Sequence, residues 1–281
     1  MSKFDNQYLE LCEKIMNEGV LCHNRTGIDT RSVVHQVLHF DLQEEFPILT
    51  CKKVAFKSAV LEMLWFYQEQ SNDVRWLQER GVKIWNEWQI DENGFYQGKD
   101  FGIENSYTIG TAYGWIVKHF KLVQDLIEKI KNNPDDRRMI MSLWQNEYIA
   151  TAALPSCVWN TQWRVLDGKL NCLVTQRSCD VALGLPFNVT QYAVLVHLIA
   201  HVTGLEVGQM TWIINDAHVY VNQFDGINIQ IARKSQCLLA PKLWINPEIK
   251  DFFEFDNSKE LKDIKLVGYE NLGKIKMEVA I

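Results

Sequence analysis

The chain has 281 residues, and its 29 Lys and Arg against 35 Asp and Glu give a net charge of −6 at pH 7. This balance excludes a global attraction to nucleic acid or to an anionic membrane, so local arginines would have to hold an anionic ligand. Hydrophobic residues make up 47% and charged residues 23% of the chain, which is typical of a soluble protein with a sizeable core.

The chain contains no linker-like stretch, low-complexity tract or internal repeat, so we expect one domain over residues 1–281. The N-terminus lacks the apolar core of a signal peptide, and no apolar run is predicted to reach membrane-spanning length. The seven cysteines form no Cys-x-x-Cys pair, which argues against a disulfide framework or a zinc site. A cytoplasmic protein without a metal is therefore expected.

The first part of the chain predicts a helix, a strand and a second helix. Apolar residues recur at helical spacing over 4–18, and residues 33–42 alternate enough to be a strand. The second helix carries a run of bulky apolar residues in which Glu62 is the one acid. A solvated stripe would be the simple interpretation of Glu62. The apolar neighbours on both sides favour burial instead, and burial raises a carboxyl pKa and allows proton exchange near neutrality.

Aromatic residues and then charges mark the middle of the chain. Trp85 and Trp88 belong to an aromatic patch that would usually be core. Residues 117–130 predict an amphipathic helix, which Pro134 follows at its end. The next run, Asp135-Asp136-Arg137-Arg138, would ordinarily be a solvated turn, and residues 139–144 then indicate a buried strand.

A hairpin is predicted around Asp167-Gly168, because this dipeptide lies between two β-favouring runs. With a two-residue turn, Leu166 faces Lys169, and Cys157 then falls opposite Ser178, one residue from Arg177. A cation beside a cysteine lowers the thiol pKa and raises the thiolate fraction, as a nucleophile requires. A surface hairpin with an inert, buried cysteine is the simple alternative.

The last part of the chain begins with Asn188, just before an apolar helix predicted over 189–202. His197 and His201 lie one turn apart on it, but the Glu of a His-Glu-x-x-His zinc motif is missing, so two core-edge histidines are expected. Residues 210–221 predict a strand, and 264–281 predict a Gly-punctuated strand pair.

The stretch from Cys157 to Asn188 resembles the signature of the thymidylate synthase family. That signature reads roughly Pro-Cys, a hairpin, and then Gln-Arg-Ser-x-Asp-x-x-Leu-Gly-x-Pro-Phe-Asn, and further matches run from Arg25 to the C-terminus. The resemblance implies an α/β (α+β) fold with a large mixed sheet, packed helices and a homodimer interface formed by sheet faces. It also implies reductive methylation of dUMP to dTMP, with 5,10-methylenetetrahydrofolate as one-carbon and hydride donor.

The resemblance assigns each matched residue a role. The implied catalytic residues are Cys157, Glu62, Arg177, Asp180 and Asn188. The residues implied to bind dUMP are Arg25, Gln176, Arg177, Ser178, Asp180, Asn188, His218 and Tyr220, with Arg137 and Arg138 reaching into the site of the partner subunit. The residues implied to bind folate are Ile84, Trp85, Trp88, Asp180, Leu183, Gly184, Phe187 and Ala280. No metal is implied.

The amide of Asn188 supplies one donor and one acceptor, which match uracil O4 and N3–H. Cytosine presents the opposite pattern, and relatives that act on it carry Asp at this position. Asn188 is therefore expected to select dUMP.

The chain departs from the family pattern at four places. Val158 follows Cys157 where many relatives have His, Asn215 replaces a Gly before Asp216, and Gln223 replaces a His after Tyr220. The fourth departure is Trp115-Ile116 after Tyr-Gly, which lies toward the cofactor side. A dUMP 5-hydroxymethylase of the same family, in which water replaces hydride, is the alternative function. A nucleic-acid-binding module is a third hypothesis, against which the acidic charge and the absence of a basic-aromatic stripe argue.

Overall fold

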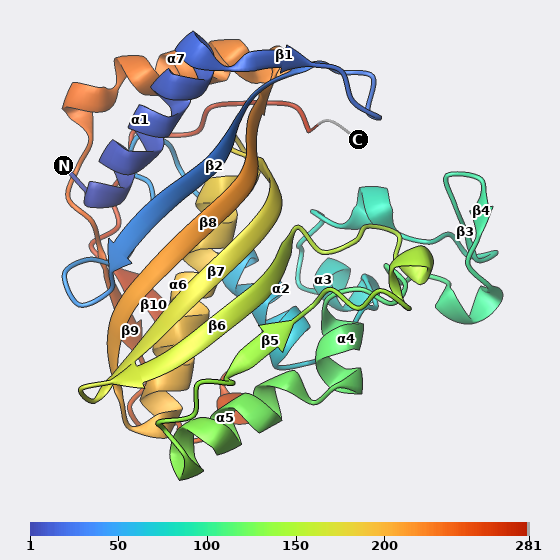
Figure 1. Ribbon diagram of the computed structural model, residues 1–281, viewed down its shortest axis with the longest axis vertical. Coiled ribbons are helices and arrows are strands. Elements are labelled where there is room, and N and C mark those ends of the chain that lie inside the picture. Colours follow the sequence, from blue (N-terminus) through green and yellow to red (C-terminus); the bar gives the residue numbers. More distant parts are fainter. Residues whose placement is uncertain (280–281) are drawn as a thin grey trace.

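The structure is a computed structural model that describes residues 1–279, with a six-stranded sheet at its centre in the order β1-β2-β8-β7-β6-β5 (Figure 1). Every neighbouring pair is antiparallel except β7 and β8, which run parallel. The predicted large mixed sheet is thus confirmed. Its strands are β1 (Val20–Cys22), β2 (Thr30–Asp41), β5 (Ile140–Ser142), β6 (Val158–Leu166), β7 (Lys169–Asp180) and β8 (Glu206–Tyr220).

Two smaller sheets stand apart from the central one. In each, two short antiparallel strands pair: β3 (Phe95–Tyr96) with β4 (Lys99–Asp100), and β9 (Lys242–Ile245) with β10 (Ile264–Val267). The α-helices are α1 (Lys3–Glu18), α2 (Phe56–Tyr67), α3 (Arg75–Glu79), α4 (Gly114–His119), α5 (Leu122–Asn132), α6 (Gly184–Thr203) and α7 (Phe224–Ala232).

Helix α6 connects the two parallel strands, because a parallel pair needs a crossover rather than a tight turn. Helix α6 packs on β7 and β8, and α2 packs on α6; both helices lie behind the sheet in Figure 1. By length and composition α6 could cross a membrane, contrary to the prediction that no apolar run reaches that length. Its most apolar window is 78% buried inside the protein, which is the property of a core helix.

Helix α1 is joined to the rest of the fold through a buried carboxylate. The side chain of Ser2 caps the helix by accepting from the N–H of Asp5 at 3.1 Å. Asp5 in turn accepts from the N–H groups of Thr50 and Cys51 at 3.0 Å and from the Thr50 hydroxyl at 2.6 Å. A buried carboxylate is stable only when such donors surround it.

Several predicted boundaries were wrong. The helix predicted over 117–130 is two helices, because Lys121 adopts a left-handed conformation (φ 51°) between α4 and α5. Helix α6 begins at Gly184, so Asn188 lies inside it; Pro186 is tolerated because it occupies the first turn. Of the strand pair predicted over 264–281, the described residues form only β10, whose partner is β9.

Replacing Asp5 with Ala should destabilise the fold, because it leaves three buried donors without an acceptor. We expect the free energy of unfolding to fall by about 3 kcal/mol or more. Asp225 is the matched control: it is exposed in the first turn of α7, so Asp225→Ala should change stability by less than about 0.5 kcal/mol. Urea unfolding followed by circular dichroism measures both, and equal losses would show that the Asp5 contacts contribute little.

Candidate active site

The predicted hairpin is present, with Leu166 opposite Lys169. A register shift between Val158 and Asn160 then moves the pairing of β6 with β7 by one residue at the end of the hairpin near Cys157. As a result, the N–H of Arg177 donates to the carbonyl of Cys157 at 2.9 Å, so Cys157 faces Arg177 and not Ser178 as predicted. The β-bulge, which inserts one unpaired residue, is the physical reason for the difference.

The Arg177 guanidinium is fixed beside the Cys157 thiol. Its Nη2 lies 3.8 Å from Sγ and donates to the carbonyl of Pro155 at 2.7 Å, while its Nε donates to the carbonyl of Ser156 at 3.0 Å. It also lies over the Trp144 ring, 5.6 Å from the centroid. The predicted position of a cation next to Cys157 is therefore confirmed.

The pKa of the Cys157 thiol is nevertheless raised, because burial disfavours the thiolate more than its neighbours stabilise it. The charges of Arg177 and Arg25 and a hydrogen bond from the Tyr113 hydroxyl act in the opposite direction. The prediction of a lowered thiol pKa is wrong for the protein alone. The largest cause of the raised pKa is the desolvation of the thiol.

Tyr113 was not predicted as a site residue. Its hydroxyl oxygen accepts from the N–H of Cys157 at 3.0 Å, and its ring stacks on Phe66 at 4.3 Å. It adopts a positive φ of 43° just before α4. Its neighbour must be glycine, because a Cβ on Gly114 would lie 2.0 Å from the Ser71 carbonyl oxygen. The Tyr-Gly pair before a helix was the available sequence signal.

Glu62 ends a chain of buried hydrogen bonds. Trp85 Nε1 and Gln191 Nε2 both donate to its carboxylate, and Asn188 Nδ2 donates to Gln191 Oε1 at 3.1 Å. Burial raises the pKa of Glu62 to about 7, while the hydrogen bonds from Trp85 and Gln191 lower it. The predicted burial of Glu62 is confirmed, and a group with this pKa exchanges protons at neutral pH.

The same chain continues on the other side of Asn188. Gln176 Nε2 donates to Asn188 Oδ1 at 3.3 Å and to the Ser178 carbonyl at 3.1 Å, and Trp212 Nε1 donates to Gln176 Oε1 at 2.9 Å. The indole can only donate and the carboxylate accepts, so the two ends fix which way each amide points. Gln191 was missed because its partners come from distant parts of the sequence.

Four polar residues meet where β7 and β8 end. Asp180 lies opposite His218 in the parallel register. His218 Nδ1 is 3.1 Å from the Asp216 carboxylate, which orients the ring, and the rings of His218 and Tyr220 lie 5.2 Å apart. Asp180 Oδ1 accepts from the N–H of Leu183 at 3.0 Å, so it also fixes the start of α6.

The residues predicted to bind folate fall into two groups. Trp85 is buried and its ring lies 5.5 Å from Trp88, while Ile84 beside it is exposed. The second group is at the start of α6, where side chains are partly exposed; its members are Leu183, Gly184 and Phe187. Ala280 lies outside the described residues.

The predicted arginines are exposed on different parts of the molecule. Burial raises the pKa of both Cys157 and Tyr220, and the charge of Arg25, in the loop between β1 and β2, opposes this at both residues, so it acts on this site. Arg138 pairs with Asp136 at 3.0 Å. The next residue, Met139, accepts a hydrogen bond at its carbonyl from the N–H of Trp163 on β6. Trp163 is six residues along the chain from Cys157, which corresponds to roughly 20 Å in an extended strand. Arg138 therefore cannot reach the Cys157 of its own chain.

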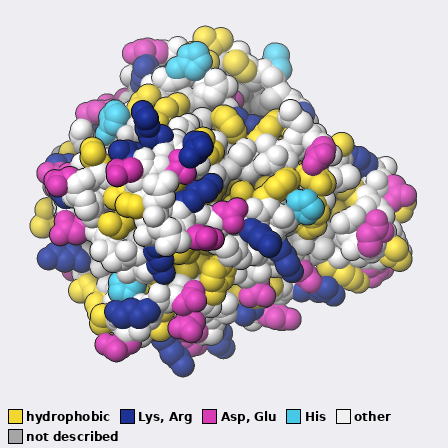
Figure 2. All heavy atoms as spheres, turned by 60° about the horizontal axis from the view of Figure 1, so that its bottom comes forward, with side chains coloured by type: hydrophobic (Ala, Val, Ile, Leu, Met, Phe, Trp, Pro, Cys, Tyr) yellow, Lys and Arg dark blue, Asp and Glu magenta, His cyan; other side chains and the backbone are white. Residues whose placement is uncertain are grey.

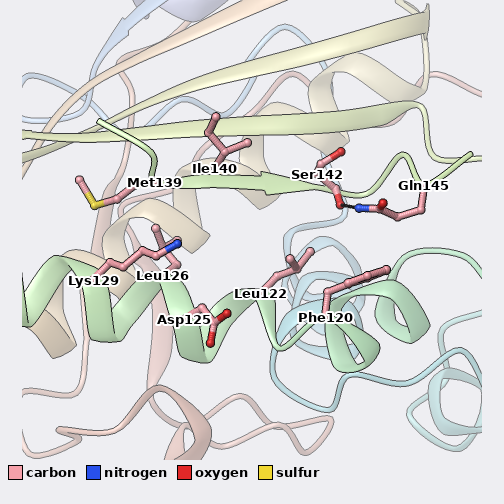
Figure 3. A pocket seen from close by; sticks show the side chains of 9 residues that line it. All are labelled: Phe120, Leu122, Asp125, Leu126, Lys129, Met139, Ile140, Ser142 and Gln145. Atoms are coloured by element: carbon pink, nitrogen blue, oxygen red, sulfur yellow. Dashed lines mark hydrogen bonds between the residues drawn. The ribbon is translucent and has the colours of Figure 1, made fainter. Parts of the chain in front are cut away.

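A cavity of about 290 Å³ lies between α5 and β5, away from Cys157 (Figure 3). Apolar side chains such as Phe120, Leu126 and Met139 line it together with Lys129 and Asp125, and none of its lining residues is a predicted site residue. Figure 2 shows acidic and basic side chains interspersed over the face that it draws. This face therefore offers no broad positive patch for nucleic acid.

Removing the charge of Arg177 should raise the pKa of Cys157 further and slow its alkylation. For Arg177→Gln we expect the rate with iodoacetamide at pH 8 to fall about tenfold, as one pKa unit predicts. Arg164→Gln, at the far end of β6, should leave the rate unchanged. Mass spectrometry of the Cys157 peptide measures it, and equal rates for all three proteins would contradict the electrostatic role of Arg177.

Comparison with known proteins agrees with this geometry. Residues 6–281 match the family model described as thymidylate synthase. The chain is 49% identical to a thymidylate synthase of Clostridium beijerinckii over 281 residues, and 41% identical to thymidylate synthase 1 of Bacillus subtilis, with all of each chain covered. The solved structure of the thermostable thymidylate synthase A from Bacillus subtilis superposes with a TM-score of 0.86, at 40% identity and 99% coverage of both chains. This chain belongs to the thymidylate synthase family.

Proposed function

We propose that this chain converts dUMP to dTMP and thus acts as a methyltransferase, with 5,10-methylenetetrahydrofolate as co-substrate and dihydrofolate as the second product. The observation that supports this most is a thiol beside a fixed guanidinium, with a base-reading amide that is linked through Gln191 to a carboxyl of near-neutral pKa. The full-length likeness to thymidylate synthases does not favour the hydroxymethylase alternative.

Cys157 is the proposed nucleophile. C5 of uracil is too weak a nucleophile to be alkylated directly, and addition of the Cys157 thiolate to C6 converts C5 into an enolate carbon. Arg177 stabilises the thiolate, which burial disfavours, and Tyr113 donates to it. The folate supplies the one-carbon unit and then the hydride that completes the methyl group.

Asn188 is the proposed reader of the base. After its bonds to Gln176 and Gln191, the Asn188 amide keeps one N–H and one oxygen lone pair, which fit uracil O4 and N3–H. Cytosine would place donor against donor and acceptor against acceptor. Leaving buried groups unpaired in this way lowers the rate by about 10²-fold or more.

Glu62 is the proposed proton carrier. With a pKa near 7 it is partly protonated at neutral pH, so it can give a proton to O4 or to the folate amine and take it back. Its hydrogen bond to Gln191, which also bonds Asn188, places it next to the base reader.

Apolar side chains around this site suit a pterin ring. We propose that Ile84, Trp85, Trp88, Leu183 and Phe187 bind the folate, with Asp180 and Gly184 at its edge and Ala280 beyond the described residues. Arg25, Arg177 and Ser178 would hold the phosphate, where guanidinium groups can pair with two oxygens at once. His218 and Tyr220 would hold the sugar. Residues 1–281 would act as one catalytic domain in the cytoplasm, without a metal.

The active unit is proposed to be a homodimer that pairs sheet faces. Figure 1 shows no helix on the near side of the sheet over β6, β7 and β8. On β2, Val34 and Val37 are 62% and 48% exposed, and pairing with a partner subunit would bury this apolar surface. Since Arg138 is roughly 20 Å from its own Cys157 along β6, it and Arg137 would serve the partner's phosphate site.

Product analysis tests the proposed function. With dUMP and methylenetetrahydrofolate, the protein should form dTMP and dihydrofolate one for one, measured by mass spectrometry and by absorbance. Cys157→Ser should still bind dUMP but lose turnover. Formation of 5-hydroxymethyl-dUMP without dihydrofolate would make the alternative function correct, and turnover by Cys157→Ser would exclude Cys157 as the nucleophile.

Subunit mixing tests the role of Arg138. Arg138→Glu and Cys157→Ser chains should each be inactive alone. After exchange, the hybrid dimer has one site in which both residues are intact, so about a quarter of the wild-type activity should return. No recovery despite exchange shown by native mass spectrometry would contradict phosphate binding by the partner's arginines.

A further inference from the structure

Gln223 joins three segments of the chain at the cofactor side of the site. It is fully buried at the start of α7. Its Oε1 accepts from the N–H of Tyr220 at 3.3 Å, and its Nε2 donates at 3.2 Å both to Asp180 Oδ2 and to the carbonyl oxygen of Glu278. The end of β8, the end of β7 and the C-terminal segment therefore share one side chain.

Only a neutral amide can satisfy these three partners. One partner donates and two accept, which matches the one carbonyl and two N–H groups of glutamine. The histidine found here in the family pattern has two ring nitrogens, so it would leave one of the three buried groups without a partner. A glutamate would oppose the Asp180 carboxylate and the Glu278 carbonyl with a third acceptor.

A second observation, independent of Gln223, holds the same segment in place. Gly226 on α7 is buried, and a Cβ there would lie 2.5 Å from the sulfur of Met277 and 3.4 Å from the Ile275 side chain. The side chains of Ile275 and Met277 thus pack directly on the α7 backbone. In Figure 1 the C-terminal segment crosses the end of the sheet close to α7.

We propose that Gln223, assisted by the small Gly226, holds the C-terminal segment against Asp180 before any ligand binds. Gln223 is then a positioning residue: it orients the carboxylate that faces the folate and docks residues 275–279 as a preformed wall. This rests on the proposed function for the identity of the ligand, but docking of the segment is a property of the protein alone. A preformed wall reduces the ordering that folate binding must otherwise complete.

The test compares Gln223→Met, which keeps the volume and loses the three polar contacts, with Asn222→Ala, an exposed neighbour in the same turn. Without ligands, trypsin should cut after Lys276 about tenfold faster in Gln223→Met than in wild type, since an opening equilibrium shifts by about this factor when a buried hydrogen bond is lost. KM for methylenetetrahydrofolate should rise by a similar factor, while the affinity for dUMP, whose proposed ligands Asp180 and Tyr220 also contact Gln223, should change less. Asn222→Ala should match wild type in all three measurements.

Gly226→Val supplies a second variant, because it displaces Met277 without touching Asp180. It should also speed cleavage after the exposed Lys276, because the freed segment fits the protease more readily, and melting curves show whether either variant stays folded. Equal cleavage in wild type and both variants would overturn the docking. Faster cleavage with an unchanged KM for the folate would overturn the link to the cofactor. If the wild type makes no dTMP, the proposed function fails, and the cleavage rates still decide whether Gln223 holds the segment.

Discussion

The parallel pairing of β7 with β8 is the constraint on which the rest of the site depends. It places Asp180 opposite His218, and because parallel strands cannot be joined by a tight turn, it requires the long crossover through α6. That helix starts at Gly184, four residues after Asp180, and carries Asn188 and Gln191. The site therefore forms at the carboxyl ends of two parallel strands and the start of the helix between them, as is common in α/β proteins.

Burial acts in opposite ways on the two central ionisable groups. It raises the pKa of Glu62 to about 7, which suits a residue that must both give and take a proton. It also raises the pKa of Cys157, which opposes formation of a thiolate. Two backbone carbonyls hold Arg177 in place beside the thiol. Because Arg177 cannot move away, its charge always counteracts part of the effect of burial on the Cys157 pKa.

The sequence predicted those parts of the site that local patterns determine. The turn at Asp167-Gly168 set the hairpin register, and apolar neighbours indicated a buried Glu62; both predictions were correct. The bulge after Val158 was not predictable, since one extra residue leaves no periodic signal. The partners of Glu62 were missed for another reason: Trp85 and Gln191 approach it from segments far away in sequence, which only the tertiary fold brings together.

The departures from the family pattern differ in what they mean physically. Asn215 is exposed on β8, and no described contact of its side chain explains why it replaces glycine. Gln223, by contrast, is buried and has every polar atom paired, so its replacement of histidine changes how three segments are joined. A departure at a buried, fully paired position requires its neighbours to fit it. This requirement is the reason to look for chain-specific behaviour at the C-terminal segment rather than at the nucleophile, which keeps Arg177 beside it as the resemblance implies.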